Sequence, residues 1–224
     1  MKRIPLIKRI LPSYTRGEEL TNMITHIVGG ALAAAALVLC VVFAALHGNV
    51  WGVVSGAVYG ASMILLYTMS SLYHGLPPKG MAKRVFQVID HCSIFLLIAG
   101  TYTPVTLCGV RPHNPALAWT LFGVVWGLAV LGIVLNAIDL RQFRTVSMIL
   151  YLGMGWCIVL AAPTVLQQTE PGAVWLLVSG GIAYTVGAAF YGAGKKHRYV
   201  HSVFHIFVVV GSILQFLCIL LYWM

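Results

Sequence analysis

The sequence contains little charge of either sign and very little acid. Only 8% of its 224 residues are charged, and five Asp and Glu stand against fourteen Lys and Arg. Soluble domains carry about 25% charged residues, and a surface with far fewer charges does not keep a chain of this length dispersed in water. The scarcity of charge excludes a soluble globular protein. The 60% of hydrophobic residues indicates instead that the chain folds in lipid.

Cysteine is also sparse and shows no pairing pattern. The five cysteines include no CxxC pair, and each lies in or beside an apolar run: Cys40, Cys92, Cys108, Cys157 and Cys218. We interpret them as free, buried, small hydrophobic residues. A cleavable signal peptide is not expected either, because the first apolar run is longer than the roughly 7 to 15 residues of a signal-peptide core. We expect the N-terminus to be retained and this run to span the membrane.

Long apolar runs make up most of the chain. A helix needs about 20 mainly apolar residues to cross about 30 Å of hydrocarbon. Seven runs meet this length, at 24–46, 51–74, 86–108, 116–138, 146–166, 172–192 and 202–224. The connections between them are short and rich in Gly, Pro, Asn and charged residues. The sequence therefore predicts an all-α integral membrane protein, with a basic segment at 1–22 followed by a single seven-transmembrane-helix bundle at 23–224.

The positive residues lie almost entirely on one side of the predicted bundle. Thirteen of the fourteen Lys and Arg fall in the N-terminal segment and in the second, fourth and sixth connections, and Arg111 is the exception. By the positive-inside rule, this distribution predicts a cytoplasmic N-terminus and, after seven spans, a C-terminus outside. Clusters at helix ends are typical of membrane topology, so we expect no nucleic-acid partner despite the net charge of +9.

Small residues and prolines inside the runs predict how the helices pack. Glycines recur every four residues in two of the runs, at Gly48, Gly52, Gly56 and Gly60 and at Gly123 and Gly127. Such stripes let two helix backbones approach closely, so we expect both to be packing surfaces. Pro104 and Pro163 lie inside the third and fifth runs, and each is expected to kink its helix.

Polar and ionisable residues gather at one end of four predicted spans, on the predicted cytoplasmic side. The four groups are Glu19, Asn22 and His26; Ser70 and His74; Asp90 and His91; and His201 and His205. Spacings of three or four residues place the members of a group on one face of a helix. Such groups are costly in hydrocarbon and usually mark a functional site. We expect the fold to gather these residues, which are far apart in the sequence, into one site.

The histidine spacing predicts a metal site. His201 and His205 project from one helical face about one turn apart, as do the two histidines of the HExxH zinc motif. A catalytic zinc ion takes three protein ligands, and His74 at the same depth is the candidate for the third.

Other readings apply to the polar residues taken singly. A lone histidine near a membrane interface is more often a hydrogen-bonded or hydrated residue than a ligand, so His47, His113 and His197 are interpreted as loop residues. Asp90 alone is equally well explained as an ion-pair partner of Lys83 or Arg84.

Taken in order, these groups resemble a known family. The motifs that carry the resemblance are Glu19-x-x-Asn22-x-x-x-His26, Ser70-x-x-x-His74, the stretch from Asp90 to Pro104, the stretch from Tyr151 to Trp156, and His201-x-x-x-His205. They resemble the bacterial hemolysin III family, within the progestin and adiponectin receptor (PAQR) group, and more distantly the alkaline ceramidases. The resemblance covers almost the whole chain. It implies a seven-helix fold in the bacterial inner membrane and a zinc ion bound by His74, His201 and His205, with Asp90 and Ser70 beside the zinc-bound water.

Two functions follow as hypotheses. In the first, the protein is a zinc hydrolase acting on a membrane-lipid amide or ester, with a role in membrane homeostasis. Asp90 would act as general base and Ser70 as hydrogen-bond donor to the developing oxyanion. Glu19, Asn22 and His26 would orient the zinc ligands. In the second, the protein is a non-enzymatic, zinc-stabilised sensor or regulator of membrane state. No oligomeric state follows from the sequence.

Two further classes fit poorly. A secreted pore-forming haemolysin needs a soluble form, which a chain of seven apolar spans does not offer. A channel or transporter needs polar groups through the full depth of the membrane, whereas the predicted outer halves carry only four scattered ones, Thr101, Thr103, Thr106 and Gln215.

Overall fold

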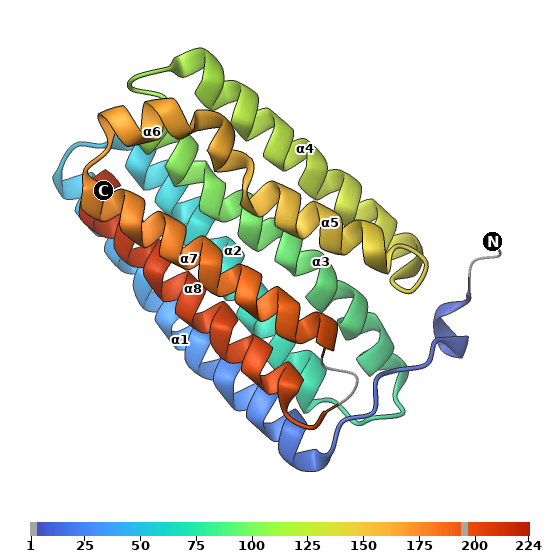
Figure 1. Cartoon of the computed structure of the whole chain (residues 1–224). Coiled ribbons are helices and arrows are strands. Elements are labelled where there is room, and N and C mark those ends of the chain that lie inside the picture. The colour runs from blue at the N-terminus through green and yellow to red at the C-terminus, as the bar shows by residue number, and fades with distance from the viewer. Residues whose placement is uncertain (1–3, 194–196) are drawn as a thin grey trace.

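The computed structural model describes residues 4–193 and 197–224, and in these ranges the chain is helical and contains no strand (Figure 1). A short 3-10 turn, η1 (Leu6–Lys8), precedes the bundle. The helices are α1 (Arg16–Leu46), α2 (Val50–Gly75), α3 (Met81–Pro104), η2 (Val105–Val110), α4 (Pro115–Asp139), α5 (Arg144–Gly155), η3 (Cys157–Ala161), α6 (Ala162–Gln168), α7 (Pro171–Ala193) and α8 (Val200–Trp223). Seven helical segments of the described chain are long and apolar enough to cross a membrane, as the sequence predicts, so this is a multi-pass membrane protein.

The segment formed by α3 and η2 is the most buried of the seven. Helices α1, α2 and α8 pack together on one side of α3, and α4 and α5 pack on another, while α7 lies along α8 (Figure 1). The N-terminal segment and the C-terminus lie at opposite ends of the bundle. We call the end at which α1 begins the basal end. Four of the basic residues behind the predicted topology, Lys2, Arg3, Lys195 and Lys196, lie outside the described residues.

Helix α1 begins eight residues earlier than the predicted span. Thr15 caps it: its side chain accepts a hydrogen bond from the Glu18 backbone N–H, and the Glu18 carboxylate accepts one of 2.8 Å from the Thr15 N–H. This reciprocal pair is the capping box that a Thr-x-x-Glu sequence predicts. Glu18 also accepts a 2.8 Å hydrogen bond from the Tyr199 N–H, which ties the start of α8 to the start of α1.

The fifth span is interrupted, and not in the way the sequence suggests. A 3-10 segment, η3, separates α5 from α6, and Pro163 lies in the first turn of α6, where its missing N–H costs nothing. The fifth span is therefore disturbed near Pro163, as predicted, but the break begins after Gly155 and Pro163 itself starts the helix that follows it. Irregular backbone at membrane depth needs partners, and Tyr102 supplies them: its hydroxyl donates to the Gly155 carbonyl and accepts from the Ile158 N–H, at 2.9 and 2.8 Å. Pro104 ends α3, where the chain continues as the π-helix η2.

The two glycine stripes behave differently. A Cβ on Gly60 would lie 2.5 Å from the Cβ of Leu37, so here α1 and α2 approach as closely as predicted. Gly52 and Gly56 likewise face Ala44 and Cys40 of α1, whereas Gly48 lies in the turn before α2, with φ +66°. On α4 the packing prediction is wrong, because a Cβ at Gly123 or Gly127 would meet nothing within 4 Å.

The cysteines are all free, as predicted. Their predicted burial holds only for Cys40 and Cys218, since Cys92, Cys108 and Cys157 are partly exposed. Exposure of these side chains to lipid carries no hydrophobic penalty, which removes the reason to bury them.

Candidate metal site and cavity

Three histidines from two helices meet at the basal end of the bundle. His74 lies in the last turn of α2, and His201 and His205 lie in the first two turns of α8. The three residues each offer one ring nitrogen within 4.8 Å of the others, an arrangement that could hold a metal ion. The Nε2 atoms of His201 and His205 are 3.1 Å apart. The fold thus brings together the three histidines that the spacing and the depth of the spans single out.

The hydrogen bonds of these histidines leave ring nitrogens without a partner, as expected at a metal site. His74 Nδ1 lies 2.6 Å from Glu19 Oε2, and because a carboxylate only accepts, Nδ1 carries the proton. The lone pair of His74 is then on Nε2, which is buried and has no hydrogen-bond partner, as is Nδ1 of His205. Buried polar atoms without partners are costly and rare. Three neutral imidazoles form a donor set that suits zinc and other late transition metals.

Glu19 is held between His74 and a buried lysine. Lys83 Nζ donates to Glu19 Oε1 at 2.7 Å and to the Leu76 carbonyl at 3.1 Å, with its side chain only 1% exposed. Lys83 is therefore not the partner of Asp90. Arg84 Nε donates to the Arg9 carbonyl instead. The ion-pair reading of Asp90 is wrong for Lys83 and Arg84, because both cations are committed elsewhere.

Two more residues of α1 surround the histidines. Asn22 is fully buried: its Oδ1 accepts from Ser202 Oγ at 2.6 Å, and its Nδ2 lies 3.4 Å from His74 Nδ1. The ring of His26 stacks on that of His205, with centroids 3.8 Å apart and planes at 24°. The predicted helical face of α1 thus lies against the three histidines, with Glu19 and Asn22 at His74 and His26 at His205.

A cavity opens from the histidine cluster into the bundle. Ser70 and Asp90 line it next to His201 and His205, and Asp90 Oδ2 has His91 Nδ1 at 3.7 Å. From there the cavity follows α8 as far as Gln215. Its walls are mainly apolar, from α3, α5, α7, η2 and η3, and include Leu97, Ile98, Val105, Leu152, Ile158, Leu177, Val178 and Val208. A polar end and a long apolar body suit an amphipathic ligand.

The motif from Tyr151 to Trp156 builds one wall of this cavity. Tyr151 donates its hydroxyl to the His91 carbonyl at 2.7 Å, and Trp156 Nε1 donates to Thr185 Oγ1 on α7 at 3.0 Å. Both residues line the cavity. The hydrogen bonds hold α5 against α3 and α7 where the fifth span is about to break.

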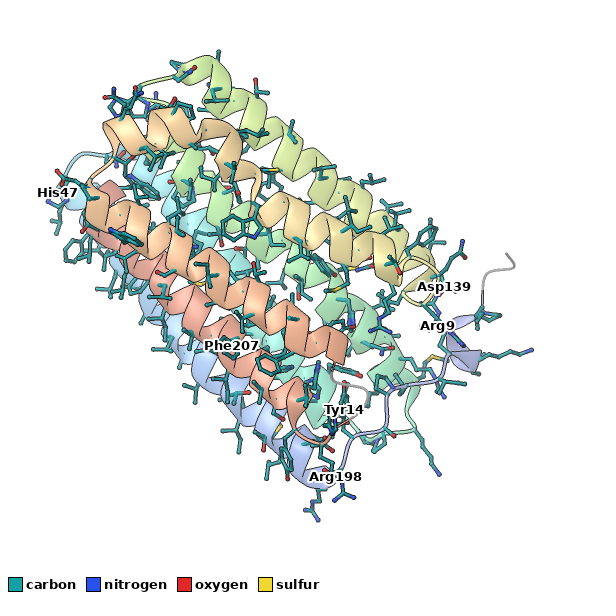
Figure 2. The ribbon with its side chains drawn as sticks, viewed as in Figure 1. Arg9, Tyr14, His47, Asp139, Arg198 and Phe207 are labelled. Atoms are coloured by element: carbon teal, nitrogen blue, oxygen red, sulfur yellow. The ribbon has the colours of Figure 1, made fainter. Side chains whose placement is uncertain are left out.

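The sequence reasoning misses Tyr14, and it considers Lys83 only as a partner of Asp90 and not of Glu19. The Tyr14 ring stacks on His201, with centroids 5.0 Å apart and planes at 18°, and burial raises the pKa of its hydroxyl above the usual range, so the hydroxyl keeps its proton. Figure 2 shows Tyr14 at the basal end, with Arg9 elsewhere on the N-terminal segment, next to Asp139 at the end of α4. That segment crosses the end of the bundle: Ile4 N–H donates to Asp139 Oδ2, and Arg9 Nη2 donates to the Ile138 carbonyl at 2.6 Å. The one sequence signal for Tyr14 is its place directly before the helix cap Thr15.

Comparison with known proteins shows the family of the chain. A family model described as "Haemolysin-III related" matches residues 14–216. The chain is 40% identical to "Hemolysin-3" of Bacillus cereus over 92% of its own length and 91% of that protein's, and 40% identical to the "Hemolysin-3 homolog" of Bacillus subtilis (strain 168) over 93% and 96%. It is 23% identical to human "Monocyte to macrophage differentiation factor" over 90% and 83%, which supports the wider PAQR grouping. The chain therefore belongs to the haemolysin III-related family of membrane proteins.

Proposed function

We propose that this protein is a zinc-dependent hydrolase that cleaves an amide or ester bond of a membrane lipid. The observation that carries the proposal is the position of the His74, His201 and His205 cluster at the polar end of a long apolar cavity inside a membrane bundle. A zinc ion held by these residues would lower the pKa of a coordinated water toward about 7. The cavity walls would hold the lipid tail and exclude bulk water from the histidine end.

The chain's own residues take the remaining roles. Asp90 lines the cavity beside the histidines, and its carboxylate would accept a proton from water there as general base. Ser70, 1% exposed on the same wall, would donate its hydroxyl hydrogen to the substrate carbonyl oxygen as negative charge develops on it. Glu19 would hold the Nδ1 proton of His74 and so keep the Nε2 lone pair available.

The proposed setting is the bacterial inner membrane with the basal end in the cytoplasm. Thirteen of the fourteen positive residues support this orientation. It places the histidine cluster near the cytoplasmic surface, below the N-terminal segment.

A non-enzymatic sensor or regulator of membrane state is the second candidate. The arrangement around the cluster favours it, because one metal would join α2 to α8 while Glu19 and Asn22 of α1 contact His74. In this reading zinc fixes the relation of three helices and no bond is cleaved.

Exchange of Asp90 for Asn separates the two functions. Purified wild type and Asp90→Asn are analysed for zinc and then incubated with total bacterial membrane lipid, with fatty-acid release followed by mass spectrometry. We expect about one zinc per chain in both proteins and release by the wild type alone, because an amide does not accept the proton. Asp139→Asn is the matched control, since Asp139 lies at the same end outside the cavity lining, and it should hydrolyse normally.

The alternative results are equally clear. Full release by Asp90→Asn would remove the base assignment. Zinc in the wild type with no release of any fatty acid would favour the sensor, and wild type without zinc would end both readings.

A further inference from the structure

Gln215 is a buried polar residue far from the histidine cluster. It lies ten residues after His205 on α8, which is about 15 Å along the helix axis. Its side chain lines the same cavity, and the residue is 5% exposed. One end of its amide is paired, because Nε2 donates to the Leu177 carbonyl of α7 at 2.9 Å. The other end, Oε1, is buried and has no partner.

The orientation of this amide is fixed by its neighbours. The Leu177 carbonyl only accepts, so the amide NH2 group must face it, and the oxygen is the atom left free. Gly180 makes room for this placement, since a Cβ there would lie 2.5 Å from Gln215 Nε2. The chain thus carries an unpaired hydrogen-bond acceptor on a residue that lines the far end of the cavity.

The other polar groups around the deep part of the cavity have partners. Thr101 donates to the Leu97 carbonyl and Tyr102 to the Gly155 carbonyl. The Tyr184 hydroxyl lies 2.8 Å from Ser212 Oγ. Among the described residues that line the cavity, the buried polar atoms without partners belong to His26 and His205, at the histidine end, and to Gln215.

The surroundings restrict the ligand that Gln215 would take. Val105, Ile158 and Leu177 line this part of the cavity, so a charged donor would lose its hydration without compensation. The ligand must therefore donate one hydrogen bond and otherwise be apolar. A neutral hydroxyl on a hydrocarbon chain does both, because the hydroxyl donates to Oε1 and the chain contacts the apolar walls.

We propose that Gln215 Oε1 accepts a hydrogen bond from a chain hydroxyl, so that the cavity selects lipids whose acyl chain is hydroxylated far from the headgroup. The inference rests on the proposed function only in that a lipid chain occupies the cavity. It does not require the lipid to be hydrolysed.

Two fatty acids test the inference on the purified full-length protein. Octadecanoate and 12-hydroxyoctadecanoate differ by one hydroxyl about two-thirds of the way along the chain, and neither has an amide or ester bond to cleave. Their dissociation constants are measured by calorimetry for the wild type, Gln215→Met and Thr120→Val. Methionine keeps the unbranched shape of glutamine without the acceptor. Thr120→Val is the control, because that hydroxyl is bonded to the Ala116 carbonyl within α4 and does not line the cavity.

We expect the wild type and Thr120→Val to bind the hydroxylated chain about tenfold more tightly than octadecanoate, the factor for one neutral hydrogen bond. Gln215→Met should lose this preference, because it offers the chain hydroxyl no acceptor and the hydroxyl would be buried without a partner. If Gln215→Met does not fold, Gly180→Ala should reduce the preference by displacing the amide.

Equal affinities in the wild type would overturn the inference and leave the hydrolase proposal intact. A preference that depends on Gln215 in a protein that releases no fatty acid would support the inference while removing the hydrolase. Binding of neither fatty acid would overturn the inference together with the lipid cavity on which it rests.

Discussion

Each histidine of the cluster has a neighbour that fixes its ring. Glu19 fixes His74 through Nδ1, Tyr14 stacks on His201, and His26 stacks on His205. Rings held in this way need little reorganisation to bind an ion, which is how neighbouring residues raise the affinity of a metal site. The affinity should therefore depend on residues that donate no ligand.

The histidines themselves give the first prediction. His74→Ala, His201→Ala or His205→Ala leaves two ligands, so zinc should fall well below one per chain by elemental analysis. The loss should also lower thermal stability in detergent, since zinc present at about 100 times its Kd adds about 2.7 kcal/mol to the folded state. His113→Ala, in an exposed turn, is the control. His47 suits this purpose less well, because its Nδ1 lies 3.1 Å from the Met224 carbonyl. Zinc retained at one per chain in His205→Ala would contradict the site.

Glu19 tests the contribution of a residue that is not a ligand. Glu19→Gln replaces the carboxylate that holds the Nδ1 proton of His74, and should weaken zinc binding about 10- to 100-fold in a competition titration with a chelator. Glu170→Gln is the matched control, because Glu170 is exposed and lies far from the histidine cluster. An unchanged zinc affinity in Glu19→Gln would mean that the carboxylate only balances Lys83.

At the residue scale, helical periodicity in the sequence predicts which side chains lie on one face of a helix. The spacings of His201 and His205, and of Glu19, Asn22 and His26, fix which residues share a face, and the depth of the spans brings those faces together. The pairing of Lys83 with Glu19 joins residues 64 apart in the sequence and depends on side-chain rotamers. No local pattern favours Glu19 over Asp90 as the partner of Lys83.

At the scale of helices, the glycine stripes show the limit of a motif. Four-residue spacing tells which glycines align, but not whether the aligned face meets a helix or lipid. The stripe on α2 faces α1 and the stripe on α4 faces open space. The position of the break between α5 and α6 also depends on another helix. The Tyr102 hydroxyl of α3 pairs with the Gly155 carbonyl and the Ile158 N–H, which the break leaves without partners inside the helix.

A matched pair of substitutions tests this difference. Gly60→Ala places a methyl group 2.5 Å from the Leu37 Cβ and should destabilise the fold by about 1–3 kcal/mol through overpacking. Gly123→Ala meets nothing and should be neutral or stabilising by up to about 1 kcal/mol, because Ala favours the helix. Thermal unfolding in detergent compares the two, and equal effects would contradict the close α1–α2 contact.

The N-terminal segment contacts the histidine cluster through Tyr14, whose ring stacks on His201. Tyr14→Ala removes the ring stacked on His201 and should let a chelator extract zinc faster than from the wild type. Tyr14→Phe keeps the ring and should match the wild type, because the stack does not use the hydroxyl. Extraction at one rate from all three proteins would show that the segment does not limit access.

At the scale of the whole molecule, the number of spans is predictable and the cavity is not. Apolar length and short connections leave few alternatives to seven helices, because the membrane fixes the length of each span. The cavity depends on where α5, η3 and α7 leave space beside α3, which packing decides. Asp90, Trp156 and Gln215 come from separate segments of the sequence, and all three line this cavity.

The orientation of the molecule gives the last prediction, because the proposed cytoplasmic position of the histidine cluster depends on it. Lys79 and Glu170 lie in connections at opposite ends of the bundle, and both are exposed, so a cysteine at either position is accessible to a reagent. With intact bacterial cells, a membrane-impermeant maleimide should label Glu170→Cys and should label Lys79→Cys only after permeabilisation. The parent protein, with its five native cysteines, sets the background. The reverse pattern would place the histidine cluster at the outer surface of the membrane and would contradict the proposed orientation.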